Sequence, residues 1–305
     1  MDALEPRLKA EAARLGFSLC GIAPAAEADT FALYEGWLDA GYAAGMGYLH
    51  DKREQRRHPS SVLSDVRSVV MLGIEYSSAP HPDPMPANHG KVARYAQGPD
   101  YHTIIWAKLN ELSAWLSREV PDSRSRGVVD TAPLLERDFA RRAGLGWIGK
   151  NTLLINPKRG SYFFLAGFLT DVEMKIDQPF ATNHCGSCTA CLDACPTQAF
   201  VKPGTLDAAK CISYLTIEHR GPLPEGADLH GWLFGCDVCQ EVCPWNRFAG
   251  AGALPHDDGL VTLDCVRILD MDTADFSKDY RGSALRRAKL EGLKRNANAV
   301  IPLQR

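Results

Sequence analysis

The chain has 305 residues, of which 45% are hydrophobic and 23% charged, and its formal net charge is −3. This composition excludes collagen, coiled coil and wholesale disorder, and the charge gives no global sign of nucleic-acid binding. The longest apolar stretch, 162–169, is too short to cross a bilayer, and the charged N-terminus does not resemble a signal peptide. We therefore expect one or two domains in the cytoplasm and no membrane partner. In that reducing compartment, ten cysteines indicate metal binding or catalysis rather than disulfides.

The first hundred residues predict a helix, a buried strand and a loop, in that order. Leucines at helical spacing predict a helix over 3–15, and an apolar, β-branched run predicts a buried strand over 67–76. Four prolines make 78–90 an irregular loop. A second amphipathic helix is predicted over 101–119, where leucine and isoleucine again recur at helical spacing.

The next segment places an aspartate between a strand and a helix. A short strand is predicted over 127–130, and Pro133 suits the first turn of a following helix. Asp130 thus stands where α/β proteins often place reacting groups, although the position also suits a plain helix N-cap. A second buried strand is predicted over 161–170. We predict an α+β protein in which residues 1–175 form a mixed α/β domain.

Eight of the ten cysteines fall in two runs and one position between them. The first run, over 185–196, reads C-x₂-C-x₂-C-x₃-C-P, a spacing in which the fourth cysteine binds the other of two iron–sulfur clusters. The second run, over 236–244, is one ligand short because Leu233 stands where a cysteine is expected, and Cys211 is the natural replacement. The crossed arrangement predicts two [4Fe–4S] clusters, one held by Cys185, Cys188, Cys191 and Cys243 and the other by Cys195, Cys211, Cys236 and Cys239.

Zinc is the competing interpretation, because paired C-x₂-C motifs also build zinc sites. Three cysteines in C-x₂-C-x₂-C and two C-P endings favour clusters. Residues 176–255 are therefore predicted to form a ferredoxin-like domain, followed by a basic, mostly helical segment over 256–305. Cys20 and Cys265 lie outside the pattern and are expected to be buried apolar side chains. Residues 1–175 contain no Walker A loop and no dinucleotide-binding glycine motif after a strand, so spacing alone indicates a two-cluster redox enzyme of unknown cofactor.

Three stretches together resemble the epoxyqueuosine reductase family: VDTAPLLERDFARRAGLGWIGKN (129–151), CGSCTACLDACP (185–196) and GCDVCQEVCPWN (235–246). The resemblance runs from the N-terminal helix to about Lys294. It implies cobalamin in the N-terminal domain, two [4Fe–4S] clusters in the ferredoxin-like domain, and reduction of epoxyqueuosine at the tRNA wobble position to queuosine, the last step of queuosine biosynthesis. Longer members continue into a helical-repeat domain, so the chain is expected to be a short form that lacks it.

The resemblance also implies roles for single residues. Asp130 is expected to be the catalytic acid for the departing oxygen, with a pKa raised by desolvation beside the corrin and Trp147. The D-x-H-x-x-G motif is absent at Asp100, so a bound cobalt is expected to lack a histidine ligand. The implied cofactor contacts are Arg57, Tyr95, Asp130, Asn151, Ser161, Ser213, Cys236 and Asp237.

A tRNA carrying epoxyqueuosine is the implied partner. Residues 278–305 carry eight Lys and Arg against two acidic residues, and with the resemblance this tail and Arg220 become candidate phosphate contacts rather than a merely solvated surface. We also expect a monomer and an unidentified electron donor such as a ferredoxin or flavodoxin system. Two alternatives stay open: a cobalamin and iron–sulfur reductase of a small organic substrate, and a two-cluster electron-transfer protein.

Overall fold

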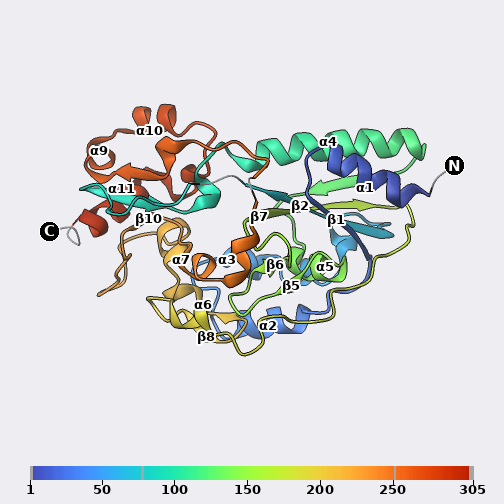
Figure 1. Ribbon diagram of the computed structural model, residues 1–305, viewed down its shortest axis with the longest axis horizontal. Helices are drawn as coiled ribbons and strands as arrows, with labels where there is room; N and C mark the ends of the chain where they lie inside the picture. The colour runs from blue at the N-terminus through green and yellow to red at the C-terminus, as the bar shows by residue number, and fades with distance from the viewer. Residues whose placement is uncertain (1–2, 77–78, 251, 302–305) are drawn as a thin grey trace.

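The structure, a computed structural model, describes residues 3–76, 79–250 and 252–301. Its N-terminal half is built on an antiparallel four-stranded sheet in the order β1-β2-β7-β4 (Figure 1). The strands are β1 (Leu19–Pro24), β2 (Ser68–Glu75), β4 (Ser125–Val128) and β7 (Phe163–Thr170). Strand β2 pairs with β1 on one side and β7 on the other, and all its residues are buried.

Helices cover both faces of this sheet because the side chains of β2 alternate between them. Val70 and Leu72 pack against α1 and α4, and Val69 and Met71 point into a core that includes residues of α2 and α5. Figure 1 shows α1 and α4 on one side of the sheet and α5 on the other. These helices are α1 (Leu4–Arg14), α2 (Phe31–Asp39), α4 (Tyr101–Glu119) and α5 (Glu136–Arg142).

Most predicted elements are confirmed. The helices predicted at 3–15 and 101–119 are α1 and α4, and the predicted buried strands at 67–76 and 161–170 are β2 and β7. The proline-rich loop has no regular structure over 79–88 and then enters strand β3, while residue 78 lies outside the described residues.

The prediction around Asp130 is less accurate. Strand β4 ends at Val128 and helix α5 begins at Glu136, so Asp130 lies in a turn between them and Pro133 precedes the helix. The four-stranded sheet is antiparallel throughout, so this turn is not the carboxyl edge of a parallel sheet.

A second sheet joins all three predicted segments of the chain. Its order is β10-β3-β11, and it takes β3 (His89–Val92) from residues 1–175, β10 (Trp232–Phe234) from 176–255, and β11 (Thr262–Asp264) from 256–305. The core around it also includes residues of α7, α9, α10 and α11 (Figure 1). These helices are α7 (Ile212–Ile217), α9 (Cys265–Asp270), α10 (Thr273–Asp279) and α11 (Lys289–Val300). The three segments therefore share one core, and the division into domains stays a prediction.

The cysteine-rich segment contains short elements only. Besides α7 and β10, they are α6 (Ala190–Asp193), β8 (Phe200–Lys202), β9 (Thr205–Leu206), α8 (Val238–Glu241) and the 3₁₀ helices η4 (Ala208–Lys210) and η5 (Pro244–Phe248). A hairpin of β5 (Trp147–Ile148) and β6 (Leu154–Ile155) and the short helix α3 (Gly47–Asp51) belong to the N-terminal half. Two 3₁₀ helices used below are η3 (Arg94–Ala96) and η7 (Ala284–Ala288). Among the helices of the described ranges, none combines the length and apolar character needed to span a membrane.

Candidate active site

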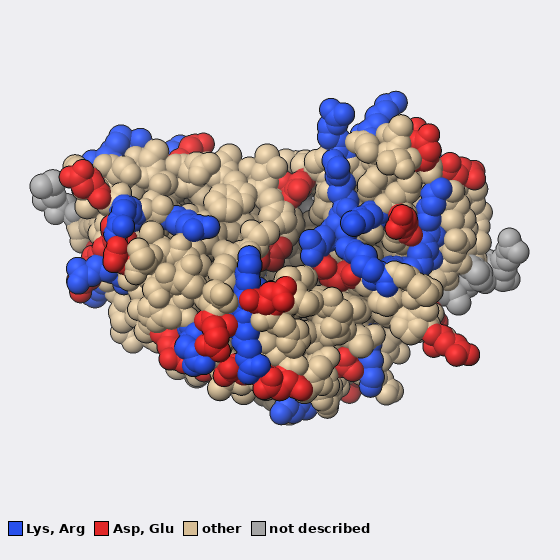
Figure 2. Space-filling model, turned by 180° about the vertical axis from the view of Figure 1, so that it is seen from behind, with Lys and Arg blue, Asp and Glu red and all other residues tan. Residues whose placement is uncertain are grey.

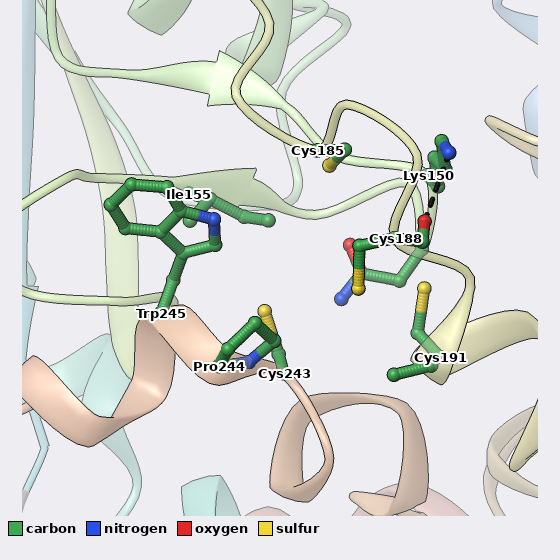
Figure 3. A pocket seen from close by; sticks show the side chains of 10 residues that line it. Lys150, Ile155, Cys185, Cys188, Cys191, Cys243, Pro244 and Trp245 are labelled. Carbon is green, nitrogen blue, oxygen red and sulfur yellow. Dashed lines mark hydrogen bonds between the residues drawn. The ribbon is translucent and has the colours of Figure 1, made fainter.

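The first predicted set of cysteines lines one pocket. Cys185, Cys188, Cys191 and Cys243 surround it together with Trp245, and Figure 3 shows the sulfur atoms of Cys188, Cys191 and Cys243 directed into the same space. Cys243 comes from the second run. The fold therefore brings the last cysteine of one run to the first three of the other, which is the juxtaposition that crossed ligation requires.

The spacing of these thiols bears on the choice between zinc and a cluster. Within the residues that the structure describes, no three His, Cys, Asp or Glu side chains converge closely enough to hold a single metal ion. The pocket takes cysteines from both runs, and the C-P endings of the two runs favour an iron–sulfur cluster over zinc.

The second set is grouped by the mutual effects of its thiols. Burial raises the pKa of Cys236 to about 12, and the thiols of Cys211 and Cys195 add to this rise. Burial also raises the pKa of Cys239, and the thiols of Cys236 and Cys211 add to that rise. Burial raises the pKa of the Cys211 thiol, while backbone N–H groups of Tyr214 and Ser213, at the start of α7, partly oppose this rise by favouring the thiolate. Iron ligation requires that thiolate form.

Leu233 and Gly235 explain why the second run begins where it does. Leu233 lies on β10 and is fully buried in the core, so its side chain is a packing residue and not a lost ligand position. Gly235 has a φ of +72°, and a Cβ atom there would lie 2.4 Å from the Cβ of Ala93. Only glycine permits this close approach to the β3 side of the sheet, which places Cys236.

The two sets lie next to each other, and they face different surroundings. Helices α6 and α8 are in contact, and the thiol of Cys191 in the first set raises the pKa of Cys239 in the second. Cys188 of the first set is solvent-exposed. Next to Cys236, the side chain of Asp237 is buried. The negative charges of Asp237 and Asp130 both raise the pKa of Tyr95, so this tyrosine lies near both carboxylates. The first set is therefore the outer one, and the second lies toward Asp130.

The expected position of Trp147 is wrong. Its ring is buried, its Nε1–H points at the sulfur of Cys185 at 3.4 Å, and its neighbours are the rings of Phe180, His184 and Trp245. Trp147 thus flanks the first cysteine set rather than Asp130. A hydrogen bond from an N–H group to a cluster sulfur is one means of tuning the potential of an iron–sulfur cluster.

Asp130 is held in an unusual backbone conformation. Its φ is +60°, a left-handed region that few residues other than glycine adopt, and its N–H donates to Oε1 of Glu136 at 2.8 Å. The N-cap of α5 is Leu135, which makes no side-chain capping bond. The alternative that Asp130 is a plain helix cap is therefore wrong.

The carboxylate of Asp130 lies on an open part of the surface. It is 61% exposed to water, yet protein groups flank it on several sides. The Tyr101 hydroxyl donates to Oδ2 at 2.7 Å, and Nε2 of His102 lies 3.7 Å from the same oxygen. The interaction with His102, followed by that with Tyr101, lowers the pKa of Asp130 despite partial desolvation. In the protein alone, the direction is therefore opposite to the rise expected beside a bound corrin.

Three residues distant in sequence also lie near Asp130, and no motif pointed to them. Arg287, in η7, forms two 2.8 Å hydrogen bonds to the carboxylate of Glu218 and lies 5.7 Å from the centre of the Tyr48 ring. The positive charge of Arg287 lowers the pKa of Asp130 and that of Tyr95. The C-terminal segment (256–305) thus contributes a cation to the site.

Aromatic side chains pack together beside Asp130. Tyr101 stacks on Phe164 with ring centres 3.9 Å apart, and Tyr95 packs against Tyr101, Phe164 and Phe234. Burial, together with the negative charges of Asp130 and Asp237, raises the pKa of Tyr95, so its hydroxyl stays protonated.

Asn151 and Ser161 lie at the junction with the cysteine-rich segment. Asn151 donates to the carbonyl of Cys239 at 3.4 Å, and the Ser161 hydroxyl donates to Gln240 at 2.9 Å. Both residues are buried. Asp237 accepts a 2.6 Å hydrogen bond from the N–H of Arg94, and burial raises its pKa to about 6.

Arg57 is placed apart from the other predicted contacts. Its guanidinium binds Glu27 at 2.9 Å and Glu54 at 3.2 Å, and it stacks over Phe31 at 4.1 Å. The preceding residue, Arg56, is buried. Its positive charge lowers the pKa of Glu136, which accepts the N–H of Asp130.

The predicted basic surface is present, but its arginines differ in what they contact. Figure 2 shows Lys and Arg gathered over the part of the molecule that contains α9, α10 and α11. Arg295 donates to the carbonyls of Leu215, His219 and Gly221, so it joins α11 to α7 and the loop after it. Arg220 donates to the carbonyls of Ile217 and Arg287 and remains exposed.

The comparisons with known proteins agree with this geometry. Residues 184–246 match the family described as a 4Fe-4S double cluster binding domain, and residues 56–131 match the family described as epoxyqueuosine reductase QueG. An epoxyqueuosine reductase of Cyclobacterium marinum is 41% identical over 96% of this chain and 95% of its own.

Two solved structures are similar over 98% of this chain and 80% of theirs. The epoxyqueuosine reductase of Streptococcus thermophilus has 29% identity and a TM-score of 0.88. An epoxyqueuosine reductase crystallised with an epoxyqueuosine-modified tRNA-Tyr stem loop has 30% identity and a TM-score of 0.87. Fold and cysteine site together define an iron–sulfur oxidoreductase with a cluster-binding domain joined to an α/β half. The chain belongs to the epoxyqueuosine reductase family.

Proposed function

We propose that this protein reduces the epoxide of epoxyqueuosine in tRNA to the alkene of queuosine. The observation that carries the proposal is the 41% identity to a reductase of that name over 96% of the chain. The likeness therefore includes the half that contains Asp130 as well as the cysteine-rich segment. The solved relative with an epoxyqueuosine-modified stem loop supports tRNA as the substrate.

We assign the eight cysteines to two [4Fe–4S] clusters with crossed ligation. The pocket shared by Cys185 and Cys243 supports the first set, and the coupling of Cys211 with Cys195 and Cys236 supports the second. Such clusters supply single electrons. Cys188 is exposed, so the outer set is the one that an external one-electron donor reaches first.

We place cobalamin at Asp130. The carboxylate there is exposed to water, the rings of Tyr95 and Tyr101 lie beside it, and Tyr95 also feels the charge of Asp237, next to the second cysteine set. When bound, cobalamin supplies a cobalt nucleophile for carbon. Both nitrogens of His102 face carboxylates, which agrees with a cobalt that lacks a histidine ligand.

Most of the implied cofactor contacts lie either near Asp130 or near the second cysteine set. Tyr95, Asn151, Ser161, Ser213, Cys236 and Asp237 are retained as proposed contacts. Arg56 is a better candidate than Arg57, because the guanidinium of Arg57 is held by Glu27 and Glu54. Asp130 is the residue we place at the reacting oxygen, with Tyr101 orienting its carboxylate.

The C-terminal segment gives the site a route to tRNA. Arg287 connects the exposed basic surface to Asp130, and Arg220 holds the backbone of Arg287. Arg281 and Arg286 are exposed on the same segment. This surface favours tRNA over a small organic substrate, and the polar and aromatic groups gathered at Asp130 distinguish the protein from a simple electron carrier.

The proposal is tested in cells that lack their own epoxyqueuosine reductase. Expression of this chain should convert epoxyqueuosine in total tRNA to queuosine, as measured by mass spectrometry of digested nucleosides. A Cys211→Ala variant, expressed at the same level, should leave epoxyqueuosine in place. Unchanged epoxyqueuosine in the presence of folded, cluster-containing wild-type protein would contradict the proposal.

A further inference from the structure

The proposed reaction has a proton requirement that Asp130 cannot meet alone. Converting an epoxide to an alkene breaks both carbon–oxygen bonds, and the oxygen leaves as water. The balance is one epoxide, two electrons and two protons giving one alkene and one water, and the electrons come from the external one-electron donor through the clusters. The pKa of Asp130 is lowered, so this carboxyl is ionised near neutrality. A second group must therefore store a proton beside it.

His102 lies between two carboxylates at the start of α4. Asp100 is the N-cap of this helix: one of its oxygens, Oδ1, accepts the N–H of His102 at 3.0 Å and also lies 2.8 Å from Nδ1 of the same ring. Nε2 lies 3.7 Å from Oδ2 of Asp130, which is ion-pair distance. The ring of Tyr101 stacks on the imidazole at 4.2 Å, so its orientation is fixed.

This geometry determines where a proton resides. A neutral imidazole has one N–H and one lone pair. If the N–H faces Asp100, the lone pair of Nε2 faces the carboxylate of Asp130, and the two negative regions repel each other. A second proton on the ring removes this conflict and gives a cation between two anions. We propose that His102 is a positioning residue that stores the proton which Asp130 passes to the departing oxygen.

The proposal rests on the proposed function and deepens it. The step it adds is a proton transfer from Nε2 of His102 to Asp130 and from Asp130 to the oxygen, while the second proton of the product water comes from solvent, to which the Asp130 carboxylate is exposed. His102 returns to the cation by taking a proton from solvent after turnover.

Other titratable groups also surround His102 and Asp130. The N-terminal end of α4 opposes a cation at His102, and the two carboxylates outweigh it, since they raise the pKa of His102. Asp130 is also faced by Arg287, Tyr48 and Glu136. Within the described residues, the charged groups that act on the imidazole are the two carboxylates of Asp100 and Asp130.

The first test is an NMR titration of the histidine ring in the cluster-loaded protein, without substrate. Wild-type His102 should titrate above its ordinary value, and its midpoint should fall by at least half a pH unit in Asp130→Asn and again in Asp100→Asn. A His102 midpoint that neither substitution moves would overturn the proposal. His230 is the matched control, because it pairs with Asp228 at 3.6 Å on the surface and should keep its midpoint.

The second test is the pH profile of single-turnover reduction of epoxyqueuosine in tRNA. Wild type should lose rate as the pH rises through the midpoint measured for His102. His102→Gln keeps an amide near Asp130 but cannot ionise, so it should react at least about tenfold more slowly, below the 10²- to 10⁴-fold typical of a direct general acid, and lack that alkaline decline. His230→Gln should behave as wild type. A His102→Gln variant that retains the wild-type profile overturns the inference and leaves the proposed function intact, whereas a wild type that does not reduce epoxyqueuosine overturns the proposed function.

Discussion

Removal of one thiol tests the grouping of the cysteines most sharply. Cys211 stands alone between the two runs, at the start of α7, and electrostatic coupling relates it to Cys195 and Cys236. Substitution by alanine leaves the second set with three ligands and leaves the first set complete. Alanine is preferred to serine because a serine oxygen can itself bind iron.

The expected magnitude follows from the two sets. Two complete [4Fe–4S] clusters correspond to about eight iron atoms per chain. Cys211→Ala should therefore retain about four after anaerobic reconstitution, together with an equal amount of acid-labile sulfide. Cys188→Ala, in the other set, should also retain about four, and the double variant should retain almost none.

Iron and sulfide analysis, with electron paramagnetic resonance of the reduced protein, measures these outcomes. Cys20→Ala is the control, because Cys20 lies on β1 outside both sets. An iron content near eight in Cys211→Ala, or stoichiometric zinc in the wild type, would refute the assignment of Cys211 to one of two iron–sulfur clusters.

Three further predictions follow from other parts of the structure. Asp130→Asn should fold and keep both clusters but react at least about a hundredfold more slowly in single turnover, and a rate near wild type would exclude Asp130 as the group at the reacting oxygen. Burial raises the pKa of Glu136 to about 8 from an ordinary value of 4.5, so the folded state holds a proton that the unfolded state releases. The resulting stability is fully present below pH 4.5 and is lost as the pH rises toward 8, with a slope of at most about 1.4 kcal/mol per pH unit. Glu136→Gln should remove this dependence in urea denaturation between pH 5 and 8, and identical pH slopes in the two proteins would contradict the assignment. Arg281→Gln combined with Arg286→Gln should flatten the salt dependence of tRNA binding by about 0.9 in log–log slope for each phosphate that no longer meets an arginine, whereas Asp270→Asn on the same segment should not flatten it, and an unchanged slope in the double variant would remove these arginines from the interface.

Deleting the tail is not a usable test of tRNA binding. Leu293, Ala297 and Val300 of α11 are fully buried in the core of the second sheet. A deletion of residues 286–305 removes this packing and would unfold the region. Substitution of exposed charged residues is therefore the usable test.

Local patterns in the sequence predicted the elements that depend on local physics. The leucine spacing of α4 predicted one buried face, and the apolar run of β2 predicted a strand buried on both faces; the fold has both. The cysteine spacing reports how a short chain wraps a cluster, so the pairing of Cys243 with the first run followed from the motif. Leu233 in the core agrees with the choice of Cys211 as the fourth thiol of the other set.

The surroundings of Asp130 could not be predicted in this way. Its pKa depends on His102 and Tyr101, which reach it from another element, and on Arg287, more than a hundred residues away. Trp147 is close to Asp130 in sequence but lies beside Cys185 in space, because the β5–β6 hairpin carries it toward the cysteine-rich segment. Such long-range placement sets the electrostatics of a site and leaves no short motif.

Turnover by the purified protein tests the central claim most directly. The chain is reconstituted anaerobically with iron, sulfide and cobalamin, supplied with a chemical one-electron reductant, and mixed with tRNA that carries epoxyqueuosine. The account predicts that the modified nucleoside loses one oxygen atom and becomes queuosine, and that omission of cobalamin or use of Cys211→Ala abolishes the conversion. Persistence of epoxyqueuosine with fully loaded protein, under conditions in which a known epoxyqueuosine reductase converts the same tRNA, would contradict it.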